Sequence, residues 1–367
     1  MKYKRCHGAL EKTATPYSRP IPKEVLQAFA KHEAERKSYE SNHGAVKEII
    51  SAEFDDWRFV ATGSTLHYAK NWKVFTDFLG PYLAGCLGKE WGERQVKLPL
   101  DDQHPIVQWH TLLGLSQQGA KPDNRGLYGT RIGAGNAWFR LAYDLYLIEH
   151  NAELKRRLIK RLRDPSHFQG ARFEAAVAAM MLAAGYDLNF ADEKGPGRHP
   201  EFYATHRETG QVLAVEAKSR HRPGILGFQA QSPAPEHPSS FDIDRLLLSA
   251  AEKDTRDPLL AFVELNSPVL LDIQSPTAIY NELDASWQKV QRRPWESGFP
   301  CAGVVFYNDI APWYLREPLP KDRNSVWALA LWPTTSRHAF DAKPLLNRIA
   351  QGCIQRSNIP LHFPERR

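Results

Sequence analysis

The stretch VLAVEAKSR, residues 212–220, decides how the second half of the chain is interpreted. Its apolar residues are typical of a β-strand, and strand side chains that are two positions apart point to the same face of a sheet. Glu216 and Lys218 therefore lie together, an acid beside a base. Two interpretations follow: the solvated face of a hairpin, or a site where a carboxylate holds a metal ion next to a catalytic lysine.

The same Glu-x-Lys spacing occurs twice elsewhere without this consequence. Glu35 and Lys37, like Glu153 and Lys155, lie in segments with a helical period, where residues two apart face different directions. Among the three examples, only the one in residues 212–220 lies on a predicted strand.

The composition is that of a globular protein. The 367 residues are 42% hydrophobic and 25% charged, and we find no run of about 18 apolar residues that would predict a membrane-spanning helix. Residues 1–12 contain no hydrophobic segment, so we expect no secretion signal and a cytoplasmic protein. The four cysteines have neither metal-binding nor disulfide-framework spacing.

The net charge of +6 is unevenly distributed along the chain. Residues 1–168 contain 26 Lys and Arg against 19 Asp and Glu, whereas the remainder contains 22 against 23. A positive first half favours contact with a polyanion, although an excess of this size is also common for solubility alone.

The pattern predicts a basic arm over residues 1–20, an α-helical domain over 21–165 and an α/β domain over 166–367. Helical periodicity in the first half covers the segments 22–37, 44–61, 71–91 and 137–163. Asn136 is the candidate N-cap of the last of these helices.

The second half alternates predicted helices with short strands, which is typical of a mixed α/β layer structure. An alanine-rich helix over 171–185 ends at Gly185. The predicted strands are 201–207, 211–219, 259–265, 301–309 and 325–332, and further helices are expected over 241–254 and 277–291.

The first two of these strands form a predicted hairpin that concerns the acids directly. If Glu208 and Thr209 form a two-residue turn, Arg207 faces Gly210 and, counting outward, Glu201 faces Glu216. Cross-strand Cβ atoms are ~5 Å apart, close enough for two carboxylates to share a cation. A three-residue loop would instead shift the register by one, and a bulge would then be needed to bring the acids together.

A third acid, Glu174, borders the apolar stripe of the helix before the hairpin and could reach toward these carboxylates. Hard oxygen ligands suit Mg²⁺ or Mn²⁺. Such a cation polarises a phosphate oxygen and lowers the pKa of a bound water. Lys218 beside that water could help to deprotonate it or stabilise developing negative charge, which is the chemistry of phosphodiester hydrolysis.

The sequence at this point resembles the PD-(D/E)xK nuclease superfamily, whose members have a restriction-endonuclease-like fold. The resemblance covers roughly residues 168–310 and depends on FEAAVAAMMLAAG (173–185), HPEFYATHR (199–207) and VLAVEAKSR (212–220). It implies an α/β fold in which helices flank a mixed sheet, here preceded by the α-helical domain.

The resemblance also implies roles for individual residues. Glu201 and Glu216 would bind the metal, Lys218 would act on the attacking water, Glu174 would add a ligand from the first helix, and the Ala217 carbonyl could also coordinate. The family usually has Asp after the Pro, whereas Glu201 follows Pro200 here. Asp192 is the alternative acid.

A basic run, KRRLIKRLR, precedes the nuclease-like part at residues 155–163. Lys155, Arg156, Lys160 and Arg163 can share one side of a helix and contact DNA phosphates, although positive charge at a helix C-terminus also favours the helix dipole. Arg220 and Arg222 flank the proposed site and are further candidates for nucleic-acid contact.

These observations lead to the expectation of a Mg²⁺- or Mn²⁺-dependent endonuclease that hydrolyses DNA phosphodiester bonds, in restriction, defence or repair. The alternative is a catalytically inactive nuclease-fold module that binds nucleic acid or a partner protein. Double-strand cleavage would suggest a homodimer, and a role in defence would suggest a partner protein from the same system.

Overall fold

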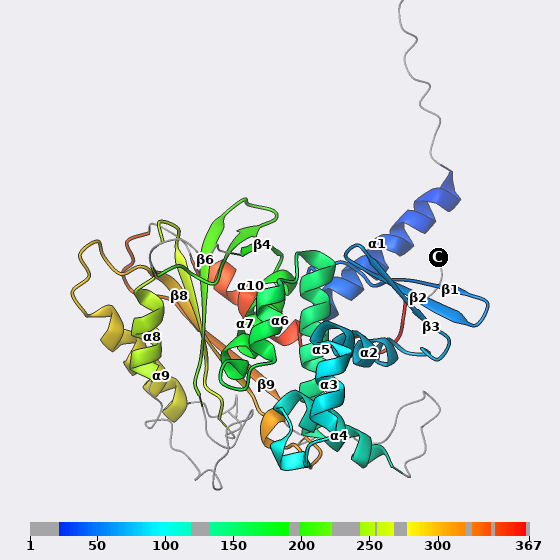
Figure 1. Ribbon diagram of the computed structural model, residues 1–367. Coiled ribbons are helices and arrows are strands. Elements are labelled where there is room, and N and C mark those ends of the chain that lie inside the picture. The colour runs from blue at the N-terminus through cyan, green and yellow to red at the C-terminus, as the bar shows by residue number, and fades with distance from the viewer. Residues whose placement is uncertain are drawn as a thin grey trace, which may run out of the picture. The chain divides into compact units, whose positions relative to one another are not determined.

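The computed structural model describes residues 22–118, 132–190, 198–221, 243–253, 255–267, 277–319, 325–338 and 342–364. The predicted basic arm over residues 1–20 lies outside these ranges. The chain divides into two compact units, Met1–Tyr39 and Glu40–Arg367. The structure is mixed α/β: it has an N-terminal helix and a mixed sheet that is flanked by helices (Figure 1).

Helix α1 (Lys23–His43) confirms the first predicted helix and extends it. None of its residues is buried, and Val25, Leu26 and Phe29 are more than half exposed. Ion pairs one turn apart, such as Arg36 with Glu33 at 2.8 Å, support a helix of this kind.

The segment after α1 corrects the prediction that residues 21–165 form an α-helical domain. Residues 50–69 form an antiparallel sheet of β1 (Ile50–Phe54), β2 (Trp57–Thr62) and β3 (Thr65–Ala69). Phe54 pairs with Trp57 and Thr62 with Thr65, so two-residue turns join the strands. Such turns require residues that accept positive φ; Asp55 and Gly63 do, and this turn chemistry overrides the helical pattern of residues 44–61.

The helices of the first half follow this sheet. They are α2 (Phe75–Leu87), α3 (Lys89–Val96), the short 3₁₀ helix η1 (Leu100–Asp102), α4 (Pro105–Gln117), α5 (Gly133–Asn151) and α6 (Arg156–Leu162). The single helix predicted over 137–163 is thus two helices, separated by residues 152–155.

Tertiary contact, rather than a polar N-cap, sets the start of α5. The N-cap position is Ile132, and the predicted cap Asn136 lies inside the helix, where its side chain donates to the Ile132 carbonyl at 3.1 Å. The N–H of Gly133 donates to the carbonyls of Tyr314 and Glu317. A Cβ at position 133 would lie 2.3 Å from the Tyr314 oxygen, so only glycine allows this approach.

The second half forms a six-stranded sheet in the order β4-β5-β6-β7-β8-β9. The strands are β4 (Tyr186–Phe190), β5 (Phe202–His206), β6 (Val212–Ser219), β7 (Leu259–Glu264), β8 (Cys301–Asp309) and β9 (Val326–Leu331). The β6–β7 and β7–β8 pairs are parallel and the other pairs antiparallel. The five predicted strands are confirmed, whereas β4 was not predicted.

Helices cover both faces of this sheet (Figure 1). The remaining helices are α7 (Phe168–Ala183), α8 (Ile243–Ala251), α9 (Thr277–Gln291), the short 3₁₀ helix η3 (Ala311–Trp313) and α10 (Ala342–Gln355). Helices α8 and α9 pack on one face over a core that includes Ala214, Val263 and Trp287. Helices α7 and α10 pack on the other face, and α5 packs against α7. No described helix is long and apolar enough to cross a membrane.

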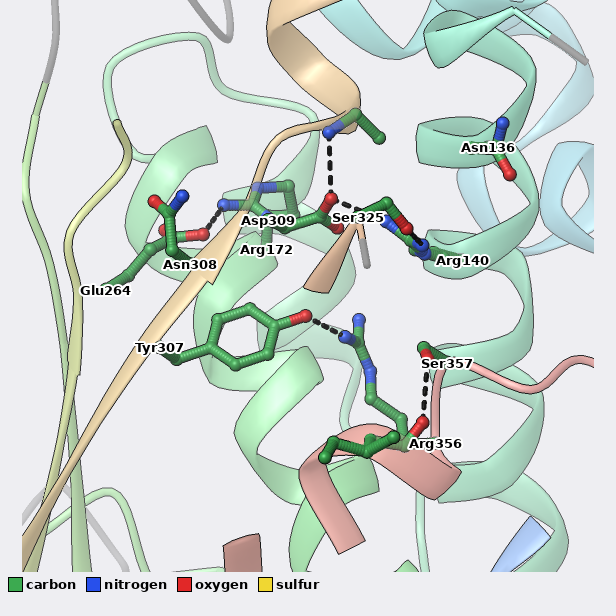
Figure 2. A network of polar contacts seen from close by, with 12 residues as sticks. Asn136, Arg140, Arg172, Glu264, Tyr307, Asn308, Asp309, Ser325, Arg356 and Ser357 are labelled. Carbon is green, nitrogen blue, oxygen red and sulfur yellow. Dashed lines mark hydrogen bonds and ion pairs between the residues drawn. The ribbon is translucent and has the colours of Figure 1, made fainter. Parts of the chain in front are cut away.

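Buried ion pairs and a hydrogen bond join helices α5 and α7 and the residue after α10 to the carboxyl ends of β7 and β8; Figure 2 shows Arg140, Arg172 and Arg356 with their partners on these strands. Arg140 of α5 donates to Asp309 at 2.5 Å, and Arg172 of α7 pairs with Glu264. The third pair joins Asp144 to Arg356, which follows α10 and also donates to the Tyr307 hydroxyl. Each pair is almost completely buried. Loss of one partner would leave the other charge unpaired in the protein interior, so both partners are needed to hold these elements together.

The Asp144–Arg356 pair leads to a stability prediction. Replacing Arg356 by Met should lower the free energy of unfolding by about 3–5 kcal/mol, because an unpaired carboxylate would remain in the protein interior. Urea denaturation measures this change. Lys289 of α9, which is exposed and pairs with Asp244, is the control for loss of a surface ion pair, and Lys289→Met should cost at most about 1 kcal/mol. Equal effects of the two substitutions would contradict the prediction.

His104, the N-cap residue of α4, leads to a pH prediction. Its ring packs against Trp91 and Phe168, and burial lowers its pKa to about 4, while Asp164 acts weakly in the opposite direction. The unfolded chain therefore takes up a proton at this residue below pH 6.5, whereas the folded protein does so only near pH 4. The stability that neutral His104 contributes is present above pH 6.5 and is lost as the pH falls toward 4.

The variant His104→Asn tests this effect, because Asn is also a good N-cap residue but does not titrate. Between about pH 7.5 and pH 5, the wild type should lose about 2 kcal/mol more unfolding free energy than the variant. Urea denaturation at the two pH values checks the difference, and parallel losses in both proteins would count against the assignment to His104.

Candidate active site

The register of β5 and β6 brings Glu201 next to Glu216. The pairs run from Thr205 with Val212 to Phe202 with Val215. Glu201 lies just beyond the last pair, its N–H donates to the Val215 carbonyl at 3.0 Å, and its charge raises the pKa of Glu216. These pairs have the predicted register, but the predicted two-residue turn is wrong: residues 207–210 form a longer loop, at whose ends the His206 N–H donates to the Gln211 carbonyl at 2.8 Å. Gly210, at a φ of 70°, closes the loop by donating its N–H to the His206 carbonyl at 2.9 Å.

Glu216 and Lys218 share one face of β6, as predicted. The Lys218 Nζ lies 2.7 Å from Oε1 of Glu216. The Glu216 side chain is completely buried, and that of Lys218 is 22% exposed. A fully buried acid beside a partly exposed ammonium group does not fit the interpretation of this face as the solvated side of a hairpin.

A second lysine, which the sequence analysis did not identify, contacts the same carboxylate. Lys253 follows α8, and its Nζ lies 3.0 Å from Oε1 of Glu216 and donates to the His199 carbonyl at 2.9 Å. A lysine at the end of a helix usually interacts with the helix dipole, so nothing in its local sequence marks it as part of a site. Only the packing of α8 on the sheet brings it to the hairpin.

The charge state of Glu216 reflects opposing influences. Burial raises its pKa and nearby Glu201 raises it further, whereas Lys218 and Lys253 lower it. Its second oxygen, Oε2, has no hydrogen-bond partner among the described residues. A buried carboxylate oxygen without a partner is costly unless a ligand completes it.

Glu174 lies on α7, which packs on the face of the sheet opposite α8, and its pKa responds to the charges of Glu201 and Glu216. The residue is 7% exposed, and its pKa is raised to about 7. Burial is the main cause, followed by the charge of Glu201, with a further contribution from Glu216. Arg161 of α6 pairs with Glu174 and opposes the shift. Sequence reasoning selected other residues of the basic run and missed Arg161.

The site therefore combines three carboxylates with three cationic groups. Glu174, Glu201 and Glu216 are the acids, and Arg161, Lys218 and Lys253 are the cations. Neighbouring carboxylates repel one another unless cations lie among them. In the protein without ligands, the side chains of α6, β6 and the end of α8 supply that compensation.

The other residues predicted for the site are Ala217, Arg220, Arg222 and Asp192. Ala217 pairs with Phe262 of β7, and its side chain faces away from Glu216 and Lys218, so only its carbonyl could take part. The N–H of Arg220 donates to the Glu264 carbonyl at 3.2 Å. Arg222 and the alternative acid Asp192 lie outside the described residues.

The basic run does not act as one surface. Lys155 precedes α6 and pairs with Glu153, and the Arg163 guanidinium lies 5.7 Å from the centre of the Trp91 ring. Arg156 and Lys160 are exposed one turn apart on α6. These two residues are the members of the predicted set that the structure leaves open to a phosphate backbone.

The carboxylates were also predicted to hold a divalent metal. Among the described residues, no group of three or more His, Cys, Asp or Glu side chains has an arrangement that already suits a metal ion. The donor chemistry nevertheless fits a hard cation, because the acids supply oxygen ligands and Oε2 of Glu216 lacks a partner. A cation would have to compete there with Lys218 and Lys253.

Comparison of the chain with protein-family models, with curated proteins and with solved structures finds no match. Assignment of a function therefore depends on the geometry and charge of these side chains.

Proposed function

We propose that this protein is a metal-dependent endonuclease that hydrolyses phosphodiester bonds of DNA. The observation that carries the proposal is the buried Glu216 carboxylate, which has Lys218 at 2.7 Å on the same strand face and Glu201 close enough to raise its pKa. A solvated hairpin would not bury this acid, and a purely structural ion pair would not leave Oε2 without a partner.

The topology supports a restriction-endonuclease-like domain. Helix α7 precedes an antiparallel meander of β4, β5 and β6, and α8 then leads to β7, which pairs in parallel with β6. The candidate residues lie on the helix, the hairpin and the strand that the resemblance assigns to them. The additional strands β8 and β9 extend the same sheet.

Each side chain has a role in the proposed reaction. Glu201 and Glu216 would hold the Mg²⁺ or Mn²⁺ ion with the Ala217 carbonyl, and Glu174 would act on it from α7. When bound, the ion supplies a Lewis acid that polarises a phosphate oxygen and lowers the pKa of a water. Lys218, next to Glu216, would orient the attacking water and stabilise negative charge on the phosphate.

Helix α6 supports DNA as the substrate. Its Arg161 contacts Glu174, so exposed Arg156 and Lys160 lie within two turns of the site. Contacts of this kind bind the backbone of any DNA sequence and orient it without specifying bases.

An inactive nuclease-fold module that binds nucleic acid or a protein is the second candidate. The observation that favours it is the internal compensation of the acids: Arg161 pairs with Glu174, and two lysines already lie on Glu216. Such a module would bind DNA in a salt-sensitive manner without cleaving it, and binding would not depend on Lys218.

Cleavage of plasmid DNA in Mg²⁺ or Mn²⁺ tests the nuclease directly. We expect Lys218→Ala to lower the cleavage rate roughly 100-fold or more, because a positioned acid–base group typically contributes at least that much. Lys289→Ala removes an exposed lysine that pairs with Asp244 outside the site, and it should leave the rate unchanged. Cleavage by Lys218→Ala at the wild-type rate would exclude the proposed role, and absence of cleavage by the wild type would favour the inactive module.

Glu201 allows a second test, of metal binding. Glu201→Gln should abolish cleavage and weaken binding of Mn²⁺, because the amide keeps the shape of the side chain but loses its charge. Glu201→Asp, which restores the residue usual in the family, should retain both. Titration calorimetry with Mn²⁺ measures the affinity separately from cleavage, and unchanged Mn²⁺ affinity in Glu201→Gln would show that this acid is not a ligand.

A further inference from the structure

Lys253 is a cationic group of the site to which the proposed reaction gives no role. Its Nζ and that of Lys218 both lie within 3.0 Å of the same Glu216 oxygen. One ammonium group is sufficient to neutralise one carboxylate, so the second requires a separate explanation. The Lys253 side chain is 17% exposed, so it keeps some access to solvent although the carboxylate it contacts is completely buried.

Lys253 is not the only tether of the segment that carries Glu201. Its neighbour Glu252 pairs with Arg198, three residues before Glu201. Loss of the Lys253 contact to the His199 carbonyl would leave this second tether in place. Removal of the Lys253 side chain is therefore expected to change the charge of the site more than its geometry.

The charge balance indicates what this lysine does when a cation binds. When all three acids are ionised, their charges are balanced by the three cationic groups. A divalent ion at the carboxylates would compete with the ammonium groups for Glu216 and leave the site with excess positive charge. Lys218 is anchored two residues from Glu216 on the same strand, whereas Lys253 comes from a different element and has a flexible stem. Lys253 is thus the group that can move to an anion.

We propose that Lys253 is a phosphate-binding residue, which the metal-free protein keeps on Glu216 and which a divalent cation releases to the DNA backbone. The proposal rests on the proposed nuclease function and deepens it, because it couples metal binding to substrate binding. In this exchange no covalent bond forms or breaks: the ammonium group leaves a carboxylate oxygen and donates to a phosphate oxygen.

The variants Lys253→Met and Lys253→Arg test the exchange, with Lys289→Met as the matched control. Lys289 pairs with Asp244 of α8, the helix that precedes Lys253. This control therefore removes one lysine charge near the same helix but outside the site. Mn²⁺ affinity is measured by calorimetry without DNA. Affinity for a short DNA duplex is measured by fluorescence anisotropy in Ca²⁺ and in EDTA. Thermal unfolding verifies that each variant is folded.

The expected effects on the two ligands have opposite signs. Lys253→Met should bind Mn²⁺ about tenfold more tightly, because a competing positive charge is gone. In Ca²⁺ it should bind DNA about tenfold more weakly, because a charged donor to phosphate is lost. In EDTA its DNA affinity should equal that of the wild type. Lys253→Arg and Lys289→Met should resemble the wild type in all three measurements.

Two results would overturn the proposal: Mn²⁺ affinity that is unchanged or weaker in Lys253→Met, or DNA affinity in Ca²⁺ equal to that of the wild type. The first would make Lys253 a structural tether, and the second would show that it does not reach phosphate. Failure of the nuclease function looks different, because the wild type itself would then neither cleave plasmid in Mg²⁺ or Mn²⁺ nor bind DNA more tightly in Ca²⁺ than in EDTA.

Discussion

The pairing register of β5 with β6 is the constraint on which the candidate site depends. Side chains alternate between the faces of a sheet, so a shift of one residue would move Glu201 to the face opposite Glu216. Burial fixes the register, because Phe202 and Ala204 must face the same layer as Leu213 and Val215. The hydrophobic core beneath the hairpin thus determines which acids meet above it.

Glu216 differs from the buried acids Asp144 and Glu264 in how its oxygens are satisfied. Asp144 has both oxygens bound by Arg356, and Glu264 has one bound by Arg172 and the other by Ser219. Those groups are complete, which is what a structural role requires. Glu216 is equally buried, yet both ammonium groups lie at one oxygen and the other has no partner among the described residues. An incomplete buried acid is better explained by a ligand than by stability.

The sequence predicted the second half of the fold better than the first. Apolar runs bounded by turn residues predicted β5 to β9 to within one residue at either end, because buried strands show their pattern locally. In the first half, the residues of β1 and β2 were predicted to be helical and β3 was not predicted, since the pattern of residues 44–61 fits both periods and the turns at Asp55 and Gly63 decide between them. The start of α5 was misplaced because it depends on contact of Gly133 with Tyr314, far away in the chain.

By itself, the sequence determined that Glu216 and Lys218 lie two residues apart on one strand and that Glu201 lies near them at the start of the neighbouring strand. These follow from local periodicity and turn geometry, which few neighbouring residues fix. Only the tertiary structure added Arg161 and Lys253 and brought Glu174 within electrostatic reach, because these side chains come from helices whose positions depend on packing against the sheet. Burial of Glu216, and with it the shift of its pKa, is likewise a property of the assembled layers rather than of its segment.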